Sequence, residues 1–380
     1  MTKLFIEFFK TEKASGMILI ACTVLSLTLA NSPLSSWYFS IWQLPLFGKD
    51  FAYWINDGLM ALFFLLVGLE IERELYAGEL SQPRKALLPI VAAAGGMLVP
   101  ALVHYAFNAG TLAQSGIGIP MATDIAFALA VLSLLGNRVP VALKIFLTAV
   151  AIIDDLGAVL VIAIFYTSSL SMMHLMIALA IAMVLLACNR LKVRSLPLYL
   201  VGGAFLWYFV YLSGVHATIA GVVLAFLIPF GKGDESSPSY RLQHRLHHPV
   251  AFLVLPLFAF ANTCLVIAPG WQISLLESNS LGIALGLALG KPVGITLFAF
   301  IGAALGVLAL PGDLKWKHIA AVSILGGVGF TMSIFITLLA FEDPALVQQS
   351  KMAILIASGV AGFLGFLMLN ISLRKGTAPS

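Results

Sequence analysis

The chain has 380 residues, of which 61% are hydrophobic and only 10% are charged. Soluble domains carry about 25% charged residues, so this composition excludes a soluble enzyme and predicts a polytopic membrane protein. The formal net charge is +4, and the three cysteines lie in apolar stretches at unrelated spacings. Such spacings indicate neither a disulfide framework nor a metal site.

Apolar runs about 20 residues long, enough to cross a bilayer, recur along the whole sequence. They predict an all-α polytopic membrane protein with about twelve transmembrane helices in a single transmembrane domain, residues 1–380. The expected helices lie at residues 14–30, 57–76, 86–107, 112–136, 140–166, 171–188, 196–212, 214–230, 249–268, 281–301, 318–341 and 351–372.

The basic residues predict the orientation. If the amino terminus is cytoplasmic, all but three of the 21 lysines and arginines fall in cytoplasmic loops or at cytoplasmic helix ends. The exceptions are Lys49, Lys291 and Lys351. Because cytoplasmic loops are enriched in Lys and Arg, we expect both termini to be cytoplasmic. The positive net charge then reflects orientation, and no nucleic-acid partner is expected.

The first external connection, residues 31–56, is rich in aromatic and turn-forming residues. It indicates either a short hairpin or an interfacial aromatic belt. The residues concerned are Trp37, Tyr38, Phe39, Trp42, Pro45, Gly48 and Lys49.

The second expected helix carries acidic residues at both ends. Asp57 begins it, and Glu70 and Glu74, one turn apart on one face, lie at its cytoplasmic end. The two glutamates are either an acidic mouth that collects cations or a solvated helix end.

Asp124 lies in the stretch GIPMATDIAFALAVL, where Pro120 removes a backbone donor and Gly116 and Gly118 weaken the helix. Thr123 can satisfy freed backbone groups or offer an oxygen ligand. An interrupted helix here would expose the partial charges of two half-helix ends within the membrane. The alternative is an ordinary proline kink with a solvated aspartate.

Asp154 and Asp155 are adjacent in the apolar run ALKIFLTAVAIIDDLGAVLVIAIFY, residues 142–166. A carboxylate at mid-bilayer costs roughly 2.5–3.5 kcal/mol on insertion scales, so two are tolerable only if they line a hydrated cavity and meet cations, protons or a basic partner. Desolvation and a like-charged neighbour both favour protonation, and hard oxygens suit a small alkali cation once the protons leave. The pair therefore indicates ion handling.

Lys291, in LALGKPVGI, is the only base expected deep within a span. An unpaired ammonium there would be costly, so we expect a carboxylate partner. Asp154 and Asp155 are about 100° apart around a helix, so one can pair with Lys291 while the other faces the cavity. A purely structural bridge is the alternative. Pro292 also lacks the amide that would bond back into the helix.

The eleventh expected helix contains ILGGVGFTMSIF, in which Gly326, Gly327 and Gly329 predict a second weak point. Close helix packing through small residues is the competing explanation. Paired interruptions in the two halves of a chain, however, are the best sequence indication of a transporter site.

Three histidines are further candidates. His216, in SGVHATIAG near the outer end of the eighth expected helix, is either a packing residue or a sensor. His244 and His247, in YRLQHRLHHP, could titrate in the physiological range or bind lipid headgroups.

Together these segments resemble the bacterial NhaA sodium/proton antiporters, in order and from about residue 12 to residue 373. The matching stretches are WINDGLMALFFLLVGLEIERE, PMATDIAFALAVLSLLG, RVPVALKIFLTAVAIIDDLGA, SGVHATIAG, LPLFAFAN, GKPVGI and GGVGFTMSIF.

The resemblance implies a transporter of the bacterial inner membrane with inverted-topology repeats and two interrupted crossing helices. It implies that Asp155, with Asp154, binds protons and sodium or lithium, and that Asp124 and Lys291 offset helix-end charges. Exchange would be electrogenic and activated at alkaline pH. It also implies a homodimer formed through segment 37–50, and no cofactor.

At the cytoplasmic approach the sequence departs from well-known members, which have a glutamate and a lysine where this chain has Gln243 and Tyr240. The departure concerns the pH response rather than transport. A sodium-coupled symporter of a small solute remains the alternative. A protease would need its aspartates on separate helices, and a channel would need rings of charge in a symmetric oligomer.

Overall fold

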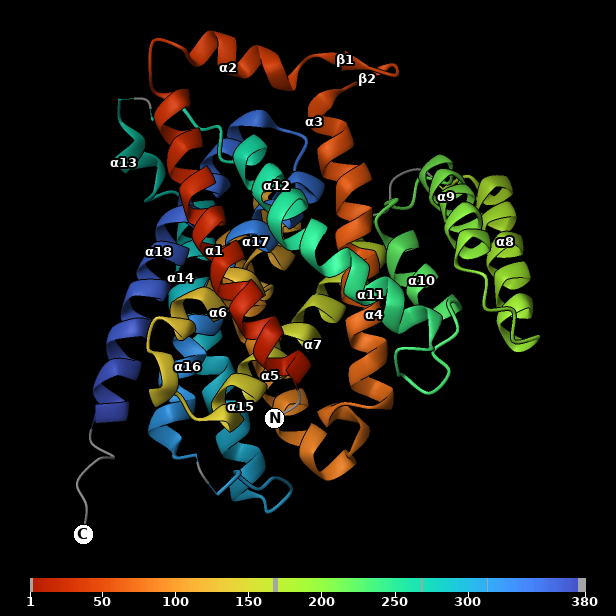
Figure 1. Ribbon diagram of the computed structural model, residues 1–380. Coiled ribbons are helices and arrows are strands. Elements are labelled where there is room, and N and C mark those ends of the chain that lie inside the picture. The colour runs from red at the N-terminus through yellow and green to blue at the C-terminus, as the bar shows by residue number, and fades with distance from the viewer. Residues whose placement is uncertain (1–2, 167–169, 268, 313, 375–380) are drawn as a thin grey trace. The chain divides into compact units, whose positions relative to one another are not determined.

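The computed structural model describes residues 3–166, 170–267, 269–312 and 314–374 (Figure 1). Nearly all elements in this part of the chain are helices. The chain divides into two compact units. Unit 1 comprises Met1–Asn31, Gln82–Ala158 and Asn262–Ser380, and unit 2 comprises Ser32–Ser81 and Val159–Ala261.

Unit 1 repeats one order of elements: a long helix, a bent pair of short helices and another long helix. Its elements are α1 (Lys3–Ala30), α5 (Pro83–Asn108), η3 (Leu112–Met121), α6 (Ile125–Ser133), η4 (Gly136–Arg138), most of α7 (Val141–Phe165), α13 (Trp271–Ser274), α14 (Ser278–Leu285), η6 (Gly286–Gly290), α15 (Lys291–Ala304), α16 (Trp316–Gly326), α17 (Phe330–Ala340) and α18 (Pro344–Arg374).

The core of unit 1 is a cluster of small and branched apolar residues from α5, α6, α7, α15, α16 and α18. Beside this core, the backbones of α5 and α15 approach each other closely. A Cβ placed on Gly95 would lie 2.2 Å from the Gly294 carbonyl oxygen, and one on Gly294 would lie 2.1 Å from that of Gly95. Small residues at a crossing let helix backbones approach, so these two glycines fix how tightly the long helices pack.

Unit 2 contains a hairpin, a long helix and a smaller helical bundle. Its elements are α2 (Ser35–Trp42), β1 (Pro45–Leu46), β2 (Lys49–Asp50), α3 (Phe51–Tyr53), η1 (Trp54–Leu59), α4 (Met60–Tyr76), η2 (Glu79–Ser81), α8 (Met172–Arg190), α9 (Leu196–Leu212), α10 (Ile219–Leu227), α11 (Pro238–Pro249), η5 (Val250–Val254) and α12 (Leu255–Asn262), which ends at the unit boundary.

The core of unit 2 joins α4, α8, α9, α10 and α11 through aliphatic residues and Tyr199. Strands β1 and β2 pair antiparallel, with Leu46 opposite Lys49. The first external connection therefore forms the hairpin that its turn residues predict.

The all-α membrane fold is confirmed, although the count of twelve spans is not. Within the described residues, seven helices are long and apolar enough to cross a membrane, and two pairs bent by 42° and 47° bring the number to nine if each pair is one span. Of the other expected spans, the one at 196–212 is present as the 17-residue helix α9. Helix α10 has only nine residues, and the span predicted at 249–268 contains the end of a helical run that begins at Pro238 with a polar half.

Candidate functional site

The two interrupted segments expected from the sequence meet at their breaks. The break between η3 and α6 places Ala122 and Asp124 in extended backbone, and the Asp124 N–H donates to the Val328 carbonyl across 2.7 Å. Segment η3 packs against α17, and α6 packs against α16. Because the first half of each segment contacts the second half of the other, the two segments run in opposite directions.

Asp124 caps two half-helices at once. Its Oδ1 accepts from the Phe127 N–H at 2.9 Å in the first turn of α6. Its Oδ2 accepts from the Thr331 N–H at 3.1 Å and from the Thr331 hydroxyl, in the first turn of α17. The amino ends of helices carry partial positive charge. One buried carboxylate therefore satisfies both ends, where the sequence places an acid.

The carboxyl ends of the other two half-helices meet donors. Lys291 Nζ donates to the carbonyl of Met121, the last residue of η3. The Thr123 hydroxyl lies 2.9 Å from the carbonyl oxygen of Gly326, the last residue of α16, and also 2.9 Å from Asp154 Oδ2. A threonine hydroxyl has one proton, so Thr123 donates to only one of these two acceptors at a time.

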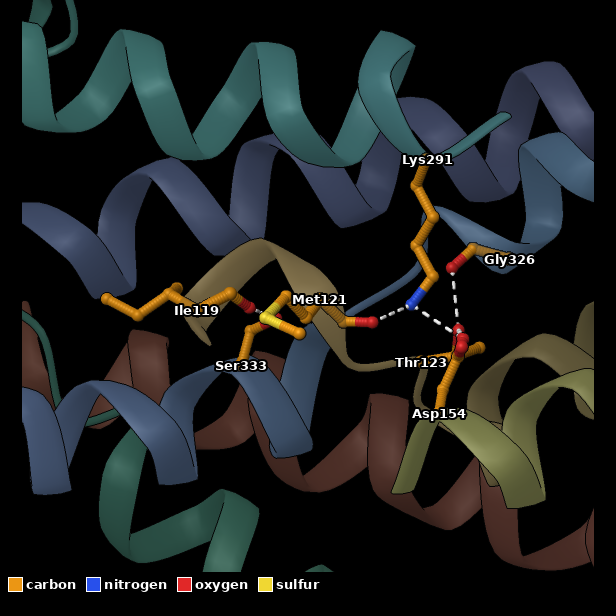
Figure 2. Close-up of polar contacts among 7 residues, drawn as sticks. All are labelled: Ile119, Met121, Thr123, Asp154, Lys291, Gly326 and Ser333. Carbon is orange, nitrogen blue, oxygen red and sulfur yellow. Dashed lines mark hydrogen bonds and ion pairs between the residues drawn. The ribbon is translucent and has the colours of Figure 1, made fainter. Parts of the chain in front are cut away.

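Lys291 and Asp154 form the ion pair that the sequence predicts. Lys291 Nζ lies 2.9 Å from Asp154 Oδ2, and both side chains are 0% exposed. Figure 2 shows the lysine reaching from α15 toward the carboxylate, with the Met121 carbonyl beside the ammonium. Asp155, the next residue on α7, is 1% exposed and acts electrostatically on Lys291. Two carboxylates and one ammonium are thus buried within one unit.

Oxygen atoms dominate the surroundings of the pair. The second oxygen of Asp154, Oδ1, has no hydrogen-bond partner among the described residues. A Cβ placed on Gly96 of α5 would lie 3.9 Å from this atom. With the Thr123 hydroxyl, two carboxylates and the carbonyls of the helix ends, the site offers hard oxygen donors, which suit small hard cations.

The backbone before Lys291 departs from a regular α-helix. Segment η6 is a π-helical turn that ends at Gly290, directly before the lysine. Pro292 has no N–H to donate and its ring crowds the preceding turn, which is a recognised cause of such irregularities. The loosened backbone expected around the lysine is present.

The residues predicted for the cytoplasmic approach come together in unit 2, between α4 and α11. His247 Nδ1 lies 3.8 Å from Glu70 Oε1. The His244 ring stacks on Tyr240 with centroids 6.4 Å apart. Glu74 follows Glu70 by one turn of α4.

The two departures from the family pattern also lie here. The Arg73 guanidinium lies over the Tyr240 ring at 5.9 Å, and Gln243 is half-buried on α11. Tyr240 therefore packs against a cation, in a position where a lysine would repel it.

Asp57 and His216 do not join this cluster. Asp57 lies in η1, inside a helix that begins at Phe51 rather than at Asp57 itself. It is thirteen residues before Glu70, about 20 Å along a helix. Its neighbours are Tyr53 and Lys49. His216 lies in the turn between α9 and α10, and its Nε2 has no partner in the described part of the chain.

Sequence reasoning missed the backbone carbonyls of Met121 and Gly326, because a carbonyl becomes a site atom only where a helix ends. It also missed a buried group on α5 and α14, His104, Asn108 and Asn279. Polar side chains inside the apolar runs 86–107 and 281–301, or directly beside them, were the available signal.

Comparison with known proteins identifies one family along nearly the whole chain. Residues 6–369 match a family model described as Na+/H+ antiporter 1. The Na(+)/H(+) antiporter NhaA 1 of Flavobacterium johnsoniae is 57% identical over 370 residues, 97% of this chain and 97% of the relative. The Na(+)/H(+) antiporter NhaA of Dechloromonas aromatica is 59% identical over 374 residues, 97% and 96% of the two chains.

A more distant relative, the Na(+)/H(+) antiporter NhaA of Vibrio parahaemolyticus, is 50% identical over 373 residues, 97% of each chain. Matches of this identity and coverage, on a helical membrane fold with two interrupted segments, leave one assignment. The chain belongs to the NhaA-type sodium/proton antiporter family.

Proposed function

We propose that this protein is a secondary transporter, not an enzyme, that exchanges external protons for cytoplasmic sodium. The observation that carries the proposal is the buried Asp154–Lys291 pair at the crossing of two interrupted helices, with Asp155 beside it. Charges at this depth are costly, so a protein retains them where they bind ions. Family membership supports the same reaction.

Sodium and protons compete for the same carboxylates in this mechanism. Asp155 and Asp154 bind sodium when deprotonated and release it when protons return. Lys291 and sodium also compete, because both cations need Asp154 Oδ2, which the ammonium holds at 2.9 Å. Thr123 can turn its hydroxyl proton from Asp154 to Gly326 and present its oxygen to the ion.

Asp124 and Lys291 support the site by holding the helix breaks in place. The carboxylate offsets the positive ends of α6 and α17, and the ammonium offsets the negative end of η3. Without them, four half-helix ends would meet in an apolar environment.

The finer properties follow from this competition. Lithium, a still smaller hard cation, would bind the same oxygens. Exchange would increase at alkaline pH because the carboxylates then lose their protons. If two protons enter for each sodium, every cycle moves one net charge inward, and the membrane potential contributes about 2.3 kcal/mol per 100 mV.

We place the protein in the bacterial inner membrane with both termini cytoplasmic. The distribution of Lys and Arg supports this orientation. The amino-terminal end of α1 and the carboxyl-terminal end of α18 also lie at the same end of unit 1 (Figure 1). Glu70, Glu74, His244 and His247 then face the cytoplasm, where they would collect cations and respond to pH. Asp57 and His216 would act on the opposite side.

The deciding experiment is the variant Asp155→Asn in everted membrane vesicles. We expect sodium-dependent proton movement to be lost because an amide cannot exchange a proton for sodium, while the protein still inserts and accumulates. Asp155→Glu should keep part of the activity. Glu342→Gln, at an exposed carboxylate, is the matched control and should behave as wild type.

Near-normal exchange in Asp155→Asn would remove this carboxylate from the mechanism. The direction of proton movement separates the alternatives, because sodium entering the vesicles drives protons out through an antiporter. If added sodium moves no protons when no other solute is supplied, a sodium-coupled symporter is favoured instead.

A further inference from the structure

A second titratable group is buried in unit 1, away from the Asp154–Lys291 pair. His104 on α5 is 0% exposed, and neither ring nitrogen has a hydrogen-bond partner among the described residues. Asn108, one turn later on the same helix, is 0% exposed, and Asn279 on α14 is 2% exposed. The His104 ring lies close to the Asn279 amide. Buried polar groups without partners are rare and costly, so this cluster requires an explanation.

Two glycines face the ring closely. A Cβ on Gly116 of η3 would lie 3.2 Å from His104 Cε1. A Cβ on Gly282 of α14 would lie 3.1 Å from His104 Cδ2 and 2.6 Å from Asn108 Nδ2. The imidazole is therefore seated between two elements that lack side chains where they face it.

The amide of Asn108 has a fixed orientation. Its Nδ2 donates to the carbonyl oxygens of His104 at 3.0 Å and Ser278 at 3.2 Å. Carbonyl oxygens only accept, so the nitrogen must occupy this position. The oxygen of Asn108 is left buried without a partner in the described part of the structure.

The amide of Asn279 is fixed by a chain of hydrogen bonds that starts at an exposed carboxylate. Gln349 Nε2 donates to Glu277 Oε2 at 2.6 Å and to the Ser274 carbonyl at 3.2 Å. Gln349 Oε1 must therefore accept, and Asn279 Nδ2 donates to it at 3.1 Å and to Ser350 Oγ at 2.9 Å. Asn279 Oδ1 is left over, buried without a hydrogen-bond donor among the described residues.

Both leftover amide atoms are thus acceptors, and both belong to residues beside the His104 ring. A neutral imidazole has one N–H, whereas a protonated one has two and carries positive charge. Only the protonated ring offers a donor for each oxygen, directly or through a bridging water. The chain from Asn279 also ends at the negative charge of Glu277, a polarity that favours a cation at its buried end.

Few other charges act on this position. Among the elements that pack against α5, neither η3, α14 nor η6 contains a titratable residue, and α15 contributes Lys291, already paired with Asp154. Glu277 precedes α14, and α18 adds Lys351 next to Ser350. The ring is therefore the titratable group at the centre of this polar cluster.

We propose that His104, with Asn108 and Asn279, is a second proton-binding site, reached from the outer surface along Gln349 and Glu277. The outward assignment rests on the orientation proposed above, in which α5 begins in the cytoplasm at Pro83 and ends outside at Asn108. The proton bonds to the free ring nitrogen of the neutral imidazole, and both N–H groups then donate to the amide oxygens.

Both sites contact the half-helix η3, the second site at Gly116 and the ion site at Met121. Gly116, against the ring, precedes Met121 by five residues of η3, about 10 Å at the rise of a 3₁₀ helix. A proton on His104 would place a positive charge about that far from the carboxylates and would disfavour sodium there. External acidity would then promote sodium release, by on the order of tenfold for unit charges about 10 Å apart.

Nitrogen-15 NMR of the histidine-labelled full-length protein tests proton binding without any transport. We expect one imidazole signal, missing from His104→Gln, to change from neutral to charged only as the pH falls from about 6 to about 4, because burial of the ring opposes its positive charge. The control His174→Gln, at a histidine bonded to Ser171 in unit 2, should keep that signal. Glu277→Gln, at an exposed residue, should weaken proton binding because the chain loses its negative end.

A His104 signal that stays neutral over this range would overturn the second site, as would a Glu277→Gln protein that titrates as wild type. The variant Asp155→Asn separates this inference from the proposed function. It should lose exchange while the His104 signal still titrates. If wild type exchanges sodium for protons normally while its His104 signal does not titrate, only the second site is refuted.

Discussion

At the scale of residues, the centre of the site is defined by competition for one oxygen atom. Asp154 Oδ2 meets both the Lys291 ammonium and the Thr123 hydroxyl at 2.9 Å, while Asp154 Oδ1 has no partner among described residues. In the proposed exchange, an incoming sodium ion would bind the free oxygen first and displace the lysine second. The ion pair would hold the carboxylate charged until a proton neutralises it or sodium displaces the lysine.

Charged residues of the site were predictable because a bilayer makes charges costly. Asp124, Asp154 and Lys291 stand out in apolar runs, and the cost of an unpaired ammonium implies a carboxylate partner for Lys291 without saying which aspartate it is. The geometry around them was not predictable. The Met121 and Gly326 carbonyls depend on where each helix ends, and a proline and some glycines locate such breaks only to within a few residues.

Removing either partner of the buried pair should destabilise the protein more than removing both. Lys291→Gln or Asp154→Asn alone leaves an uncompensated buried group, which costs up to about 3–5 kcal/mol. The double variant should recover part of that loss. Thermal unfolding in detergent measures all three, with Lys192→Gln at an exposed lysine as control.

Two residues that do not interact would give a different pattern of destabilisation. If the losses of the two single variants simply add in the double variant, the residues do not interact directly. Lys291 and Asp154 would then be close in space without forming an ion pair that sodium must break.

At the scale of elements, long uniform apolar runs were predicted well and short or irregular ones were not. Nine of the expected spans correspond to continuous helices or bent pairs. Helix α10 is too short to cross a bilayer, and the π-helical turns η1, η5 and η6 have no periodicity that a sequence reveals. Tertiary contacts decide such local geometry, so the sequence locates these segments less precisely than the long apolar helices.

The crossing of α5 and α15 offers a test of helix packing. Gly294→Ala should destabilise the protein and reduce exchange, because a Cβ there would lie 2.1 Å from the Gly95 carbonyl oxygen and force the helices apart. Overpacking typically costs about 1–3 kcal/mol. Thermal unfolding and sodium-dependent exchange measure the two effects.

The matched control is Gly359→Ala on α18, where nothing lies within 4 Å of an added Cβ. Alanine is favoured over glycine inside a helix by roughly 0.5–1 kcal/mol, so this variant should be as stable as wild type or more so. A Gly294→Ala protein that matched Gly359→Ala would show that α5 and α15 separate without cost.

At the scale of the whole molecule, the two units divide the work. Unit 1 holds both interrupted segments and the buried charges, and unit 2 holds the Glu70–His247 cluster and the hairpin. The hairpin and the neighbouring helix α2 expose apolar side chains. Phe47 at the hairpin turn is 87% exposed and Trp37 on α2 is 60% exposed.

The hairpin and the neighbouring helix α2 are held to their own unit by hydrogen bonds. Trp54 Nε1 donates to the Leu46 carbonyl at 2.7 Å, and the Tyr38 hydroxyl on α2 donates to the Phe260 carbonyl at 2.6 Å. A two-stranded hairpin by itself is marginally stable and leaves strand edges that can pair. Because the turn residues Phe47 and Gly48 both have positive φ, the sequence maintains this hairpin at a conformational cost.

We expect the hairpin to join two copies of the chain. Replacing residues 45–50 with a Gly-Ser turn should convert a dimer into a monomer, as measured by native mass spectrometry and by cross-linking in membranes. Sodium-dependent exchange should persist because Asp154, Asp155 and Lys291 all lie in unit 1. Leu112→Ser, at another leucine that is 86% exposed, should leave the dimer intact. A dimer that survived loss of the hairpin would mean that other surfaces hold the two copies together, and the exposed Phe47 would then be a membrane-interface anchor instead.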